Sequence, residues 1–367
     1  MPPEPLAGAE RFLLVRLDNV GDVVILAPAA RAIRAAQPAA TIGLLCSPAG
    51  ATAAPLLPWI DEVRTESVAW QDASRPPGFE PARERAFLER LTAGRWDAAL
   101  IFTSFSQTAF AAGYAAYLAG IPIRAGQAIG FGGAVLTHQV EPIAWEAHEA
   151  DRDLRLLEGL GIPVVSRAPH VVVPEAAHAA TAALLAADGL EAGEGYVLVV
   201  PGASCASRRY PVSRYAVAAA RIRAVSGLRI VVAGTAAEHD LAGPVLDAVP
   251  DAISLVGRTT VAQLAALVAR SAVVVCGNSA AMHLADALAR PVVAIFAGTD
   301  LESQWAPRRA PAVLLRRPTP CHPCYRMDCP FGLECLDVDP AEVADAAIRL
   351  LDIPGPKTED PWVAYAS

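Results

Sequence analysis

The sequence predicts an α/β protein with two doubly wound parallel-sheet domains that face a central cleft. Short apolar runs alternate with Ala- and Leu-rich stretches of helical period almost from end to end, which is typical of parallel strands joined by crossover helices. The alternation is interrupted by a Pro-punctuated stretch at 163–174. Because 367 residues suffice for two domains that each bury a core, we expect an N-terminal domain over 1–170, a C-terminal domain over 171–353 and a poorly ordered tail over 354–367.

The elements of the first half follow from this alternation. The first apolar run, at 12–17, has the length and aliphatic content of a buried strand, and the Ala-rich stretch at 23–36 has apolar residues at helical spacing. Further strands are predicted at 41–46, 63–68 and 98–102, and further helices at 81–93, 107–118 and 147–160. The last of these helices ends at Gly161 with Pro163 just beyond, which is a common stop signal.

The second half repeats the pattern. Apolar runs predict strands at 196–200, 229–233, 253–256, 272–276 and 292–296. Helical patterns fall at 212–224, 237–248, 261–269, 280–289 and 341–351. In the first half, four charged or titratable residues are interpreted as a solvated first turn of a helix, with a position facing the cleft as the alternative; they are Glu146, His148, Asp151 and Arg152.

Composition and charge exclude several classes of protein. With 54% hydrophobic and 19% charged residues, the chain is too apolar to stay unfolded. Its net charge of −8 has the wrong sign for a nucleic-acid binder, so no nucleic-acid partner is expected. The start at 1–11 lacks the pattern of a secretory signal, and no run reaches the ~18 apolar residues of a membrane span. We expect a cytoplasmic protein, for which peripheral contact with the inner membrane stays open.

The turn after the first strand is the first candidate for chemistry. It contains Gly21 and Asp22, and open α/β sheets bind ligands at the carboxyl ends of their strands. A glycine there lets the backbone approach a ligand closely. The alternative is that Asp22 or Asn19 only caps the following helix. The turn lacks the G-x-G-x-x-G pattern, which disfavours NAD or FAD binding.

Two turns in the second half suit an anionic ligand. The small residues at 201–204 precede Arg208 and Arg209, and those at 278–281 open a helix that contains His283. Free backbone N–H groups at a helix start and a nearby guanidinium group favour a diphosphate. The alternatives are a solvated loop for the arginines and a core or capping role for the histidine.

Five sequence blocks together resemble the heptosyltransferase family, glycosyltransferase family 9. They lie at 16–23, 201–204, 207–211, 278–285 and 296–300, and the resemblance covers 12–351. It implies a GT-B fold, in which one Rossmann-like domain binds the acceptor and the other binds the nucleotide-sugar. It also implies transfer of heptose from ADP-heptose to a lipopolysaccharide-core or other glycan acceptor, free or lipid-linked, with inversion and with no cofactor required for catalysis.

The resemblance also implies roles for individual residues. Asp22 matches the family's catalytic aspartate, the general base on the acceptor hydroxyl. The residues expected to bind the nucleotide-sugar donor are Gly21, Ser204, Arg208, Glu238, Thr259, Asn278, Ser279, Ala280 and His283. Asn278 and Ala280 stand where the family usually has aspartate and glycine, and Arg208 replaces a lysine. The alternatives are therefore a GT-B transferase with another donor or acceptor, and a catalytically idle nucleotide-sugar-binding relative.

Four cysteines form a separate motif near the end of the second half. Cys321, Cys324, Cys329 and Cys335 include one C-x-x-C pair, which is typical of half a zinc or iron–sulfur site, but the second pair lacks this spacing. We expect a structural zinc site there, with disulfides or free thiols as the alternatives. In each case the cluster would fix a loop and take no part in catalysis.

Overall fold

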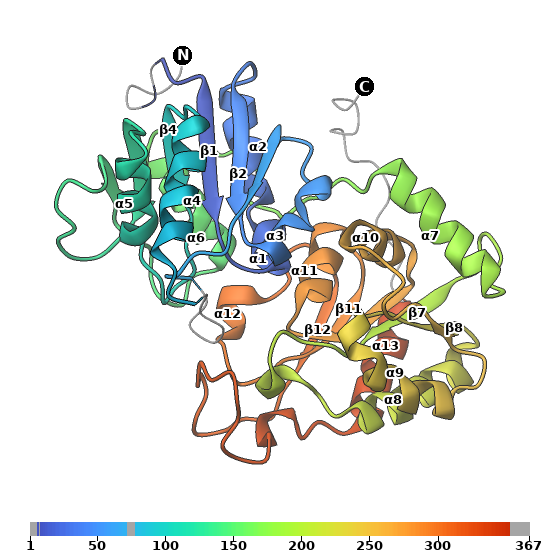
Figure 1. Cartoon of the computed structure of the whole chain (residues 1–367). Helices are drawn as coiled ribbons and strands as arrows, with labels where there is room; N and C mark the ends of the chain where they lie inside the picture. Colours follow the sequence, from blue (N-terminus) through green and yellow to red (C-terminus); the bar gives the residue numbers. More distant parts are fainter. Residues whose placement is uncertain (1–5, 7, 72–77, 353–367) are drawn as a thin grey trace. The chain divides into compact units, whose positions relative to one another are not determined.

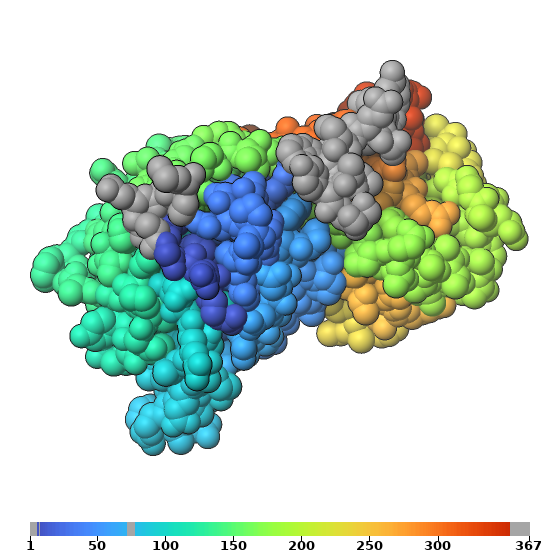
Figure 2. All heavy atoms as spheres, turned by 90° about the horizontal axis from the view of Figure 1, so that it is seen from above, coloured from blue at the N-terminus to red at the C-terminus, as the bar shows by residue number. Residues whose placement is uncertain are grey.

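The computed structural model describes residues 6, 8–71 and 78–352; the residues outside this description, which include the predicted tail at 354–367, are grey in Figures 1 and 2. The chain divides into an N-terminal unit, Met1–Pro169, and a C-terminal unit, His170–Ser367. Each unit contains one parallel sheet of six strands. Within the described ranges, no helix is both long enough and apolar enough to cross a membrane.

The sheet of the N-terminal unit has the strand order β3-β2-β1-β4-β5-β6. Its strands are β1 (Arg11–Arg16), β2 (Thr41–Cys46), β3 (Glu62–Thr65), β4 (Ala98–Ile101), β5 (Ile123–Gln127) and β6 (His138–Val140). The central strand β1 pairs Leu14 with Leu44 of β2 and with Leu100 of β4. These three strands are almost wholly buried, as expected of a parallel sheet with helices on both faces.

Six α-helices accompany this sheet (Figure 1). They are α1 (Val20–Ile25), α2 (Ala27–Ala36), α3 (Pro48–Ala51), α4 (Pro81–Ala93), α5 (Phe110–Leu118) and α6 (Glu149–Gly159). The prediction of one helix at 23–36 is wrong because the helix is interrupted at Leu26, next to Pro28. Proline lacks an N–H group and suits the first turn of a helix, so α2 starts anew there.

The C-terminal unit repeats this architecture with the strand order β12-β11-β10-β7-β8-β9. Its strands are β7 (Tyr196–Val200), β8 (Arg229–Val232), β9 (Ile253–Ser254), β10 (Val273–Gly277), β11 (Val292–Ile295) and β12 (Ala312–Leu315). Its helices are α7 (Glu175–Ala187), α8 (Val212–Ser226), α9 (His239–Ala248), α10 (Val261–Arg270), α11 (Ala280–Ala287), α12 (Glu302–Trp305) and α13 (Pro340–Leu351).

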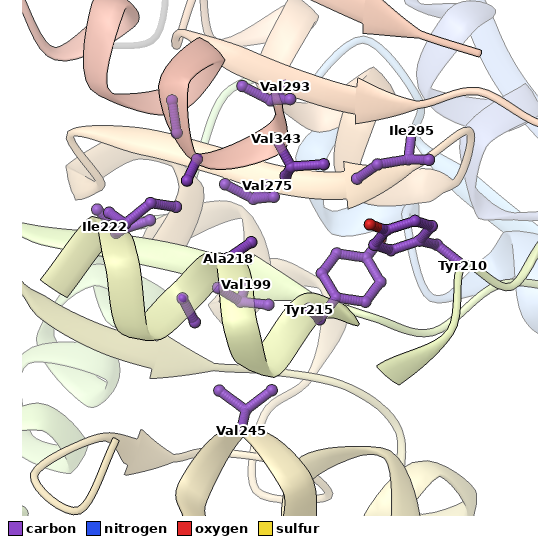
Figure 3. Packing of buried hydrophobic residues seen from close by; sticks show 14 of the residues in the cluster. Val199, Tyr210, Tyr215, Ala218, Ile222, Val245, Val275, Val293, Ile295 and Val343 are labelled. Carbon is purple, nitrogen blue, oxygen red and sulfur yellow. The ribbon is translucent and has the colours of Figure 1, made fainter. Parts of the chain in front are cut away.

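A large hydrophobic cluster of the C-terminal unit lies between the sheet and the helices α8, α9 and α13. Figure 3 shows Val199, Val275 and Val293 of the sheet among aliphatic side chains of these helices. Tyr210 and Tyr215 close one end of this core, with their rings edge to face at 5.0 Å between centroids. Because Tyr210 and Val199 flank the turn at 201–204, this core holds that turn in place.

The elements that the sequence did not predict include β5, β6, β12 and α7, besides the four-residue helices α3 and α12. β5, β6 and β12 are short. β5 and β6 also carry polar residues, such as Arg124 and Gln139, so these two strands lack a continuous apolar run. α7 is alanine-rich, with residues such as Thr181 and Leu185 buried and most others exposed. It lies just after the Pro-punctuated stretch, where no helix was predicted.

Candidate active site

The carboxyl end of β1 carries an arginine that faces four carboxylates. The Arg16 side chain is 0% exposed. Its Nε atom lies 3.0 Å from Asp18 Oδ2, and its Nη1 atom lies 3.1 Å from Asp153 Oδ1. Its Nη2 atom lies 3.1 Å from Asp22 Oδ1 and 2.9 Å from Glu149 Oε1. We call Arg16, Asp18, Asp22, Glu149 and Asp153 the acidic cluster.

The predicted catalytic residue Asp22 is held at both of its carboxylate oxygens. Oδ1 faces Arg16, and Oδ2 accepts a hydrogen bond of 3.0 Å from the backbone N–H of Asn19. This second bond belongs to a capping box at the start of α1. Asp22 therefore does cap the helix, the alternative left open by the sequence, and it also belongs to the acidic cluster. Gly21, beside it, is buried within α1.

Burial and mutual repulsion perturb the titration of the acidic cluster. Burial raises the pKa of Asp18 to about 6, that of Asp153 to about 7 and that of Glu149 to about 8, although Arg16 opposes each shift. For Arg16, burial opposes the charged form, but the four surrounding carboxylates raise its pKa well above its ordinary value. The cluster thus binds protons at pH values where exposed carboxylates are fully ionised.

The charged start of α6 was interpreted from the sequence as solvated, and this interpretation is wrong for Arg152 and does not hold for its neighbours Glu149 and Asp153 either. Glu149, Arg152 and Asp153 are buried. Arg152 donates to the backbone oxygen and the hydroxyl of Thr103 and lies over the ring of Phe105. Sequence periodicity does place positions 149, 152 and 153 on one face of a helix, but the arginine that they face on β1 lies far away in the sequence.

A cavity of about 240 Å³ lies within the N-terminal unit beside this cluster. Its lining includes Leu17, Trp70, Phe102 and Thr108 together with two amide side chains, Gln71 and Gln107. Both amides donate to Asp18 Oδ1, at 2.6 and 2.7 Å. The cavity therefore combines an aromatic and aliphatic wall with polar groups that are fixed by the cluster. No sequence pattern predicted this cavity.

In the C-terminal unit the predicted donor residues gather at one edge of the sheet. The strands β11, β10, β7 and β8 are neighbours, so the turns that follow them lie side by side at their carboxyl ends. These turns contain Asn278 and Ser279 after β10, the segment 201–204 after β7 and Glu238 after β8. Thr259 lies farther along, between the edge strand β9 and α10.

Arg208 and Asn278 meet at an acidic residue that was not among the predicted binding residues. Arg208 Nη2 lies 2.7 Å from Asp300 Oδ2, and its Nε atom donates to the Thr299 hydroxyl at 3.1 Å. Asn278 Nδ2 donates to the same Asp300 oxygen at 3.2 Å, and Asn278 Oδ1 accepts from the N–H of Ala297. We call Arg208, Asn278, Thr299 and Asp300 the donor-side network.

Glu238 lies over two glycines. A Cβ atom on Gly202 would stand 2.0 Å from Glu238 Oε1, and one on Gly234 would stand 3.0 Å from Oε2. Oε2 accepts hydrogen bonds from the N–H and the hydroxyl of Thr235 in a capping box. The two glycines thus give the carboxylate room beside the turn at 201–204.

The other predicted donor residues have different surroundings. Ser204 is exposed, and Ala280 is the first residue of α11. Ser279 is the N-cap residue of α11, and its buried Oγ atom has no hydrogen-bond partner in the described part of the chain. The ring of His283 meets that of Trp305 at 6.1 Å between centroids. Ser279 therefore has a hydrogen-bonding atom that is available to a ligand.

The four cysteines lie in the loop between β12 and α13 and are free thiols. Burial raises the pKa of Cys335, and the other three thiols raise it further. Among the residues described, no three or more His, Cys, Asp or Glu side chains are arranged to hold a metal ion. The loop bonds to the donor-side turns, because Cys324 and Tyr325 donate through their N–H groups to the carbonyls of Gly298 and Thr299.

Comparison with known proteins identifies the family. The model of glycosyltransferase family 9 (heptosyltransferase) matches residues 84–334. The chain belongs to this family. No curated protein sequence matches the chain. The predicted membership of family 9 is thereby confirmed, and the protein is a glycosyltransferase.

Solved structures of family 9 share the fold. The glycosyl transferase family 9 protein from Veillonella parvula DSM 2008 has a TM-score of 0.75 at 20% identity, with 95% of this chain and 99% of that chain covered. The ADP-heptose LPS heptosyltransferase II of E. coli has a TM-score of 0.72 at 22% identity, with 93% and 98% covered. E. coli heptosyltransferase WaaC, solved with ADP-2-deoxy-2-fluoro heptose, has a TM-score of 0.62 at 19% identity, with 84% and 93% covered. The predicted GT-B fold class is confirmed.

Proposed function

We propose that this glycosyltransferase moves heptose from ADP-heptose to a lipopolysaccharide-core or other glycan acceptor, with inversion, with Asp22 as general base and without a metal. The observation that carries the proposal is the position of Asp22. Its carboxylate lies at the carboxyl end of the central strand, oriented by Arg16 and by the N–H of Asn19. A sugar hydroxyl is a weak nucleophile, so a positioned base supplies about 10²- to 10⁴-fold in rate.

The proposed chemistry is a single displacement. An oxygen lone pair of the acceptor hydroxyl attacks C1 of the donor sugar on the face opposite the diphosphate. The bond from C1 to the phosphate oxygen breaks, and its electron pair leaves with the nucleoside diphosphate. The hydroxyl proton passes to Asp22. Direct attack inverts the anomeric centre, and no covalent sugar–enzyme intermediate forms.

On the donor side, Arg208 and the start of α11 are proposed to hold the diphosphate. The negative charge on the leaving group grows in the transition state, and fixed N–H dipoles with a guanidinium group stabilise it. The unpartnered Ser279 Oγ supports this assignment because it is a buried hydrogen-bonding atom at the same turn. Glu238 is proposed to accept hydrogen bonds from the ribose. ADP-heptose is favoured as donor because a structural neighbour is an ADP-heptose LPS heptosyltransferase.

On the acceptor side, the cavity of the N-terminal unit is proposed to take a sugar of the acceptor. Trp70 offers a ring on which a sugar packs, and Gln71 and Gln107 offer amide groups. A lipid-linked acceptor would bring the enzyme to the cytoplasmic face of the inner membrane, so we propose a cytoplasmic enzyme with peripheral membrane contact. Co-sedimentation with vesicles that carry the acceptor tests this contact.

A transfer assay tests the function directly. The full chain is incubated with ADP-heptose and a lipopolysaccharide-core acceptor without added metal, and the product is analysed by NMR. The proposal predicts one glycosidic product with the anomeric configuration opposite to that of the donor, unchanged by a chelator. A product with retained configuration, or chelator-sensitive transfer, would rule out the proposed mechanism.

A different nucleotide-sugar donor is the second candidate, and Asn278, which stands where the family usually has aspartate, favours it. Asp300 places a negative charge where a diphosphate would bind Arg208, while Asn278 removes the carboxylate usual in the family. Thermal-shift measurements with ADP, UDP, GDP, dTDP and CMP discriminate between the donors, because a ligand of the native state raises its stability. Selective stabilisation by ADP supports the first candidate, whereas no response to any nucleotide indicates an idle relative.

We also propose that Cys321, Cys324, Cys329 and Cys335 bind a structural zinc ion. Four thiolates are a suitable ligand set for zinc. The other three thiols are near enough to Cys335 to raise its pKa. The thiols would have to come closer together than they are in this structure, so binding would tighten the loop over Gly298 and Thr299. Elemental analysis of the purified protein should give one zinc per chain, lost in Cys329→Ser and kept in Cys46→Ala. Protein free of metal would refute the proposal.

A further inference from the structure

The acidic cluster has more negative charge than its arginines can balance. Four carboxylates of the cluster lie near two guanidinium groups, those of Arg16 and Arg152. Glu149 and Asp153 are fully buried, on successive turns of α6. Burying an unbalanced charge is costly, and such a group becomes neutral instead by binding a proton.

The hydrogen bonds of this pair are also incomplete. Glu149 Oε1 and Asp153 Oδ1 face Arg16, but Glu149 Oε2 and Asp153 Oδ2 are buried without a hydrogen-bond partner in the described residues. A carboxylate offers only acceptors, whereas a protonated carboxyl group offers one O–H donor. One proton on the pair would remove a negative charge and turn one of these buried acceptors into an O–H donor.

Arg16 connects this pair to Asp22. Its Nη2 atom has two hydrogens but three acceptors, namely Asp22 Oδ1, Glu149 Oε1 and the Ser104 hydroxyl, at 2.9 to 3.1 Å. A change of charge on Glu149 therefore changes how strongly Nη2 binds Asp22. Likewise, a change of charge on Asp22 changes how strongly Nη2 binds Glu149, and Asp22 loses its negative charge when it takes a proton.

We propose that Glu149 and Asp153 share one proton at neutral pH and act through Arg16 as positioning residues for Asp22. The link to catalysis rests on the proposed function of Asp22, but the shared proton does not. When Asp22 takes the proton of the sugar hydroxyl, it becomes neutral and its ion pair with Arg16 is lost. Arg16 Nη2 then turns toward Glu149, and the stronger ion pair with Glu149 offsets that loss. When the pair loses its proton, Glu149 competes with Asp22 for the same nitrogen and loosens the base.

Further charged groups lie near the pair. Arg16, Asp18 and Asp22 approach it from β1 and α1, and Arg152 from α6 itself. The elements that pack against α6 carry further charged or titratable residues, namely Arg31 and Arg34 of α2, Arg124 of β5 and His138 of β6, and partners outside α6 are seen for the last three. Arg34 of α2 pairs with Asp61, Arg124 of β5 donates to four backbone carbonyls, and His138 of β6 contacts the Thr137 hydroxyl.

Infrared spectroscopy of the full chain tests the shared proton without any substrate. The wild type should show the carbonyl band of a neutral carboxylic acid at neutral pH. Glu149→Gln and Asp153→Asn should each lose this band, because the remaining partner then ionises. Glu158→Gln on the same helix, an exposed residue paired with Arg167, should keep it. A wild type without the band, or a band that survives in both pair variants, would overturn the proposal.

Titration of the same band tests the link to Asp22. Asp22→Asn removes a negative charge from Arg16, so the pair should release its proton at lower pH than in the wild type, whereas Glu158→Gln should leave the midpoint in place. An unchanged midpoint in Asp22→Asn would disprove the coupling. In the transfer assay, the wild type should lose kcat on the alkaline side and Glu149→Gln should not. Failure of all transfer would contradict the proposed function and leave the infrared result intact.

Discussion

The two units use one arginine each in opposite ways. In the N-terminal unit, Arg16 is fully buried and faces four carboxylates. In the C-terminal unit, the side chain of Arg208 is 26% exposed and faces one carboxylate, that of Asp300, with neutral partners around it. The first arrangement has an excess of negative charge and suits a proton acceptor. The second leaves a cation within reach of solvent and suits an anionic ligand.

The largest expected difference between the two units is in the loss of stability when each arginine is replaced. Arg16→Met leaves four carboxylates without their shared cation, and breaking a buried ion pair in this way costs about 3 to 5 kcal/mol of unfolding free energy. Arg208→Met removes a partly exposed pair, so its cost should be below about 1 kcal/mol. Urea unfolding of the two variants measures both. A loss in Arg16→Met as small as that in Arg208→Met would contradict the description of the cluster.

The acidic cluster should also give stability an unusual dependence on pH. Burial raises the pKa of Glu149 from 4.5 to about 8, and that of Asp153 from 3.8 to about 7. Between the unfolded and folded values, the native state binds protons that the unfolded chain has released, so stability falls as pH rises from about 4 to about 8. Urea unfolding across this range should show the fall in the wild type and a smaller one in Glu149→Gln. Stability that rises over this range would show that the cluster is ionised.

A smaller change, in ADP affinity, is expected when the single carboxylate of the donor-side network, that of Asp300, is replaced. Asp300→Asn removes the anion that competes with a diphosphate for Arg208 while keeping the shape of the side chain. ADP affinity measured by calorimetry should rise about fivefold, which corresponds to roughly 1 kcal/mol for one charged hydrogen bond. Asp345→Asn, which breaks the exposed pair with Arg221, serves as the control. Weaker ADP binding would mean that Asp300 itself holds the donor.

The smallest effect on stability should come from Gly202. The Cβ atom of Gly202→Ala would meet the end of the flexible Glu238 side chain, which can move away at the cost of its capping bonds from Thr235, so the unfolding free energy should change by less than about 1 kcal/mol. The displaced carboxylate should nevertheless weaken ADP binding. Gly43→Ala is the contrasting variant, because its Cβ atom would lie 2.2 Å from the buried ring of Trp96. Equal stability losses in the two would disprove this account of Glu238.

How much the sequence predicts differs between the two units. The turns at the carboxyl ends of the strands could be predicted, because apolar runs mark the strands and small residues mark the turns that follow. Asn278 does follow directly after a strand, β10, and Asp22 and Arg208 lie in the segments that follow β1 and β7. Strands such as β6 were not predicted, because their own residues carry no apolar pattern and only their pairing with a neighbouring strand, here β5, defines them.

The acidic cluster itself could not be predicted, because it depends on distant contacts. Glu149 and Asp153 lie more than a hundred residues from Arg16, and a charged helix start is ordinarily solvated. Only the fold shows that a buried arginine at the end of β1 lies opposite this helix. The same limit applies to the ion pair between Asp300 and Arg208, because these two residues lie on different turns.

The central claim is that Asp22 is the base, and the most direct measurement compares Asp22→Asn with the wild type in transfer and in ADP binding. The asparagine keeps the shape of the side chain and cannot take a proton. We predict that kcat falls by about 10²- to 10⁴-fold while the dissociation constant for ADP stays nearly unchanged. Full transfer activity in Asp22→Asn would contradict the account and leave Asp22 as a helix cap.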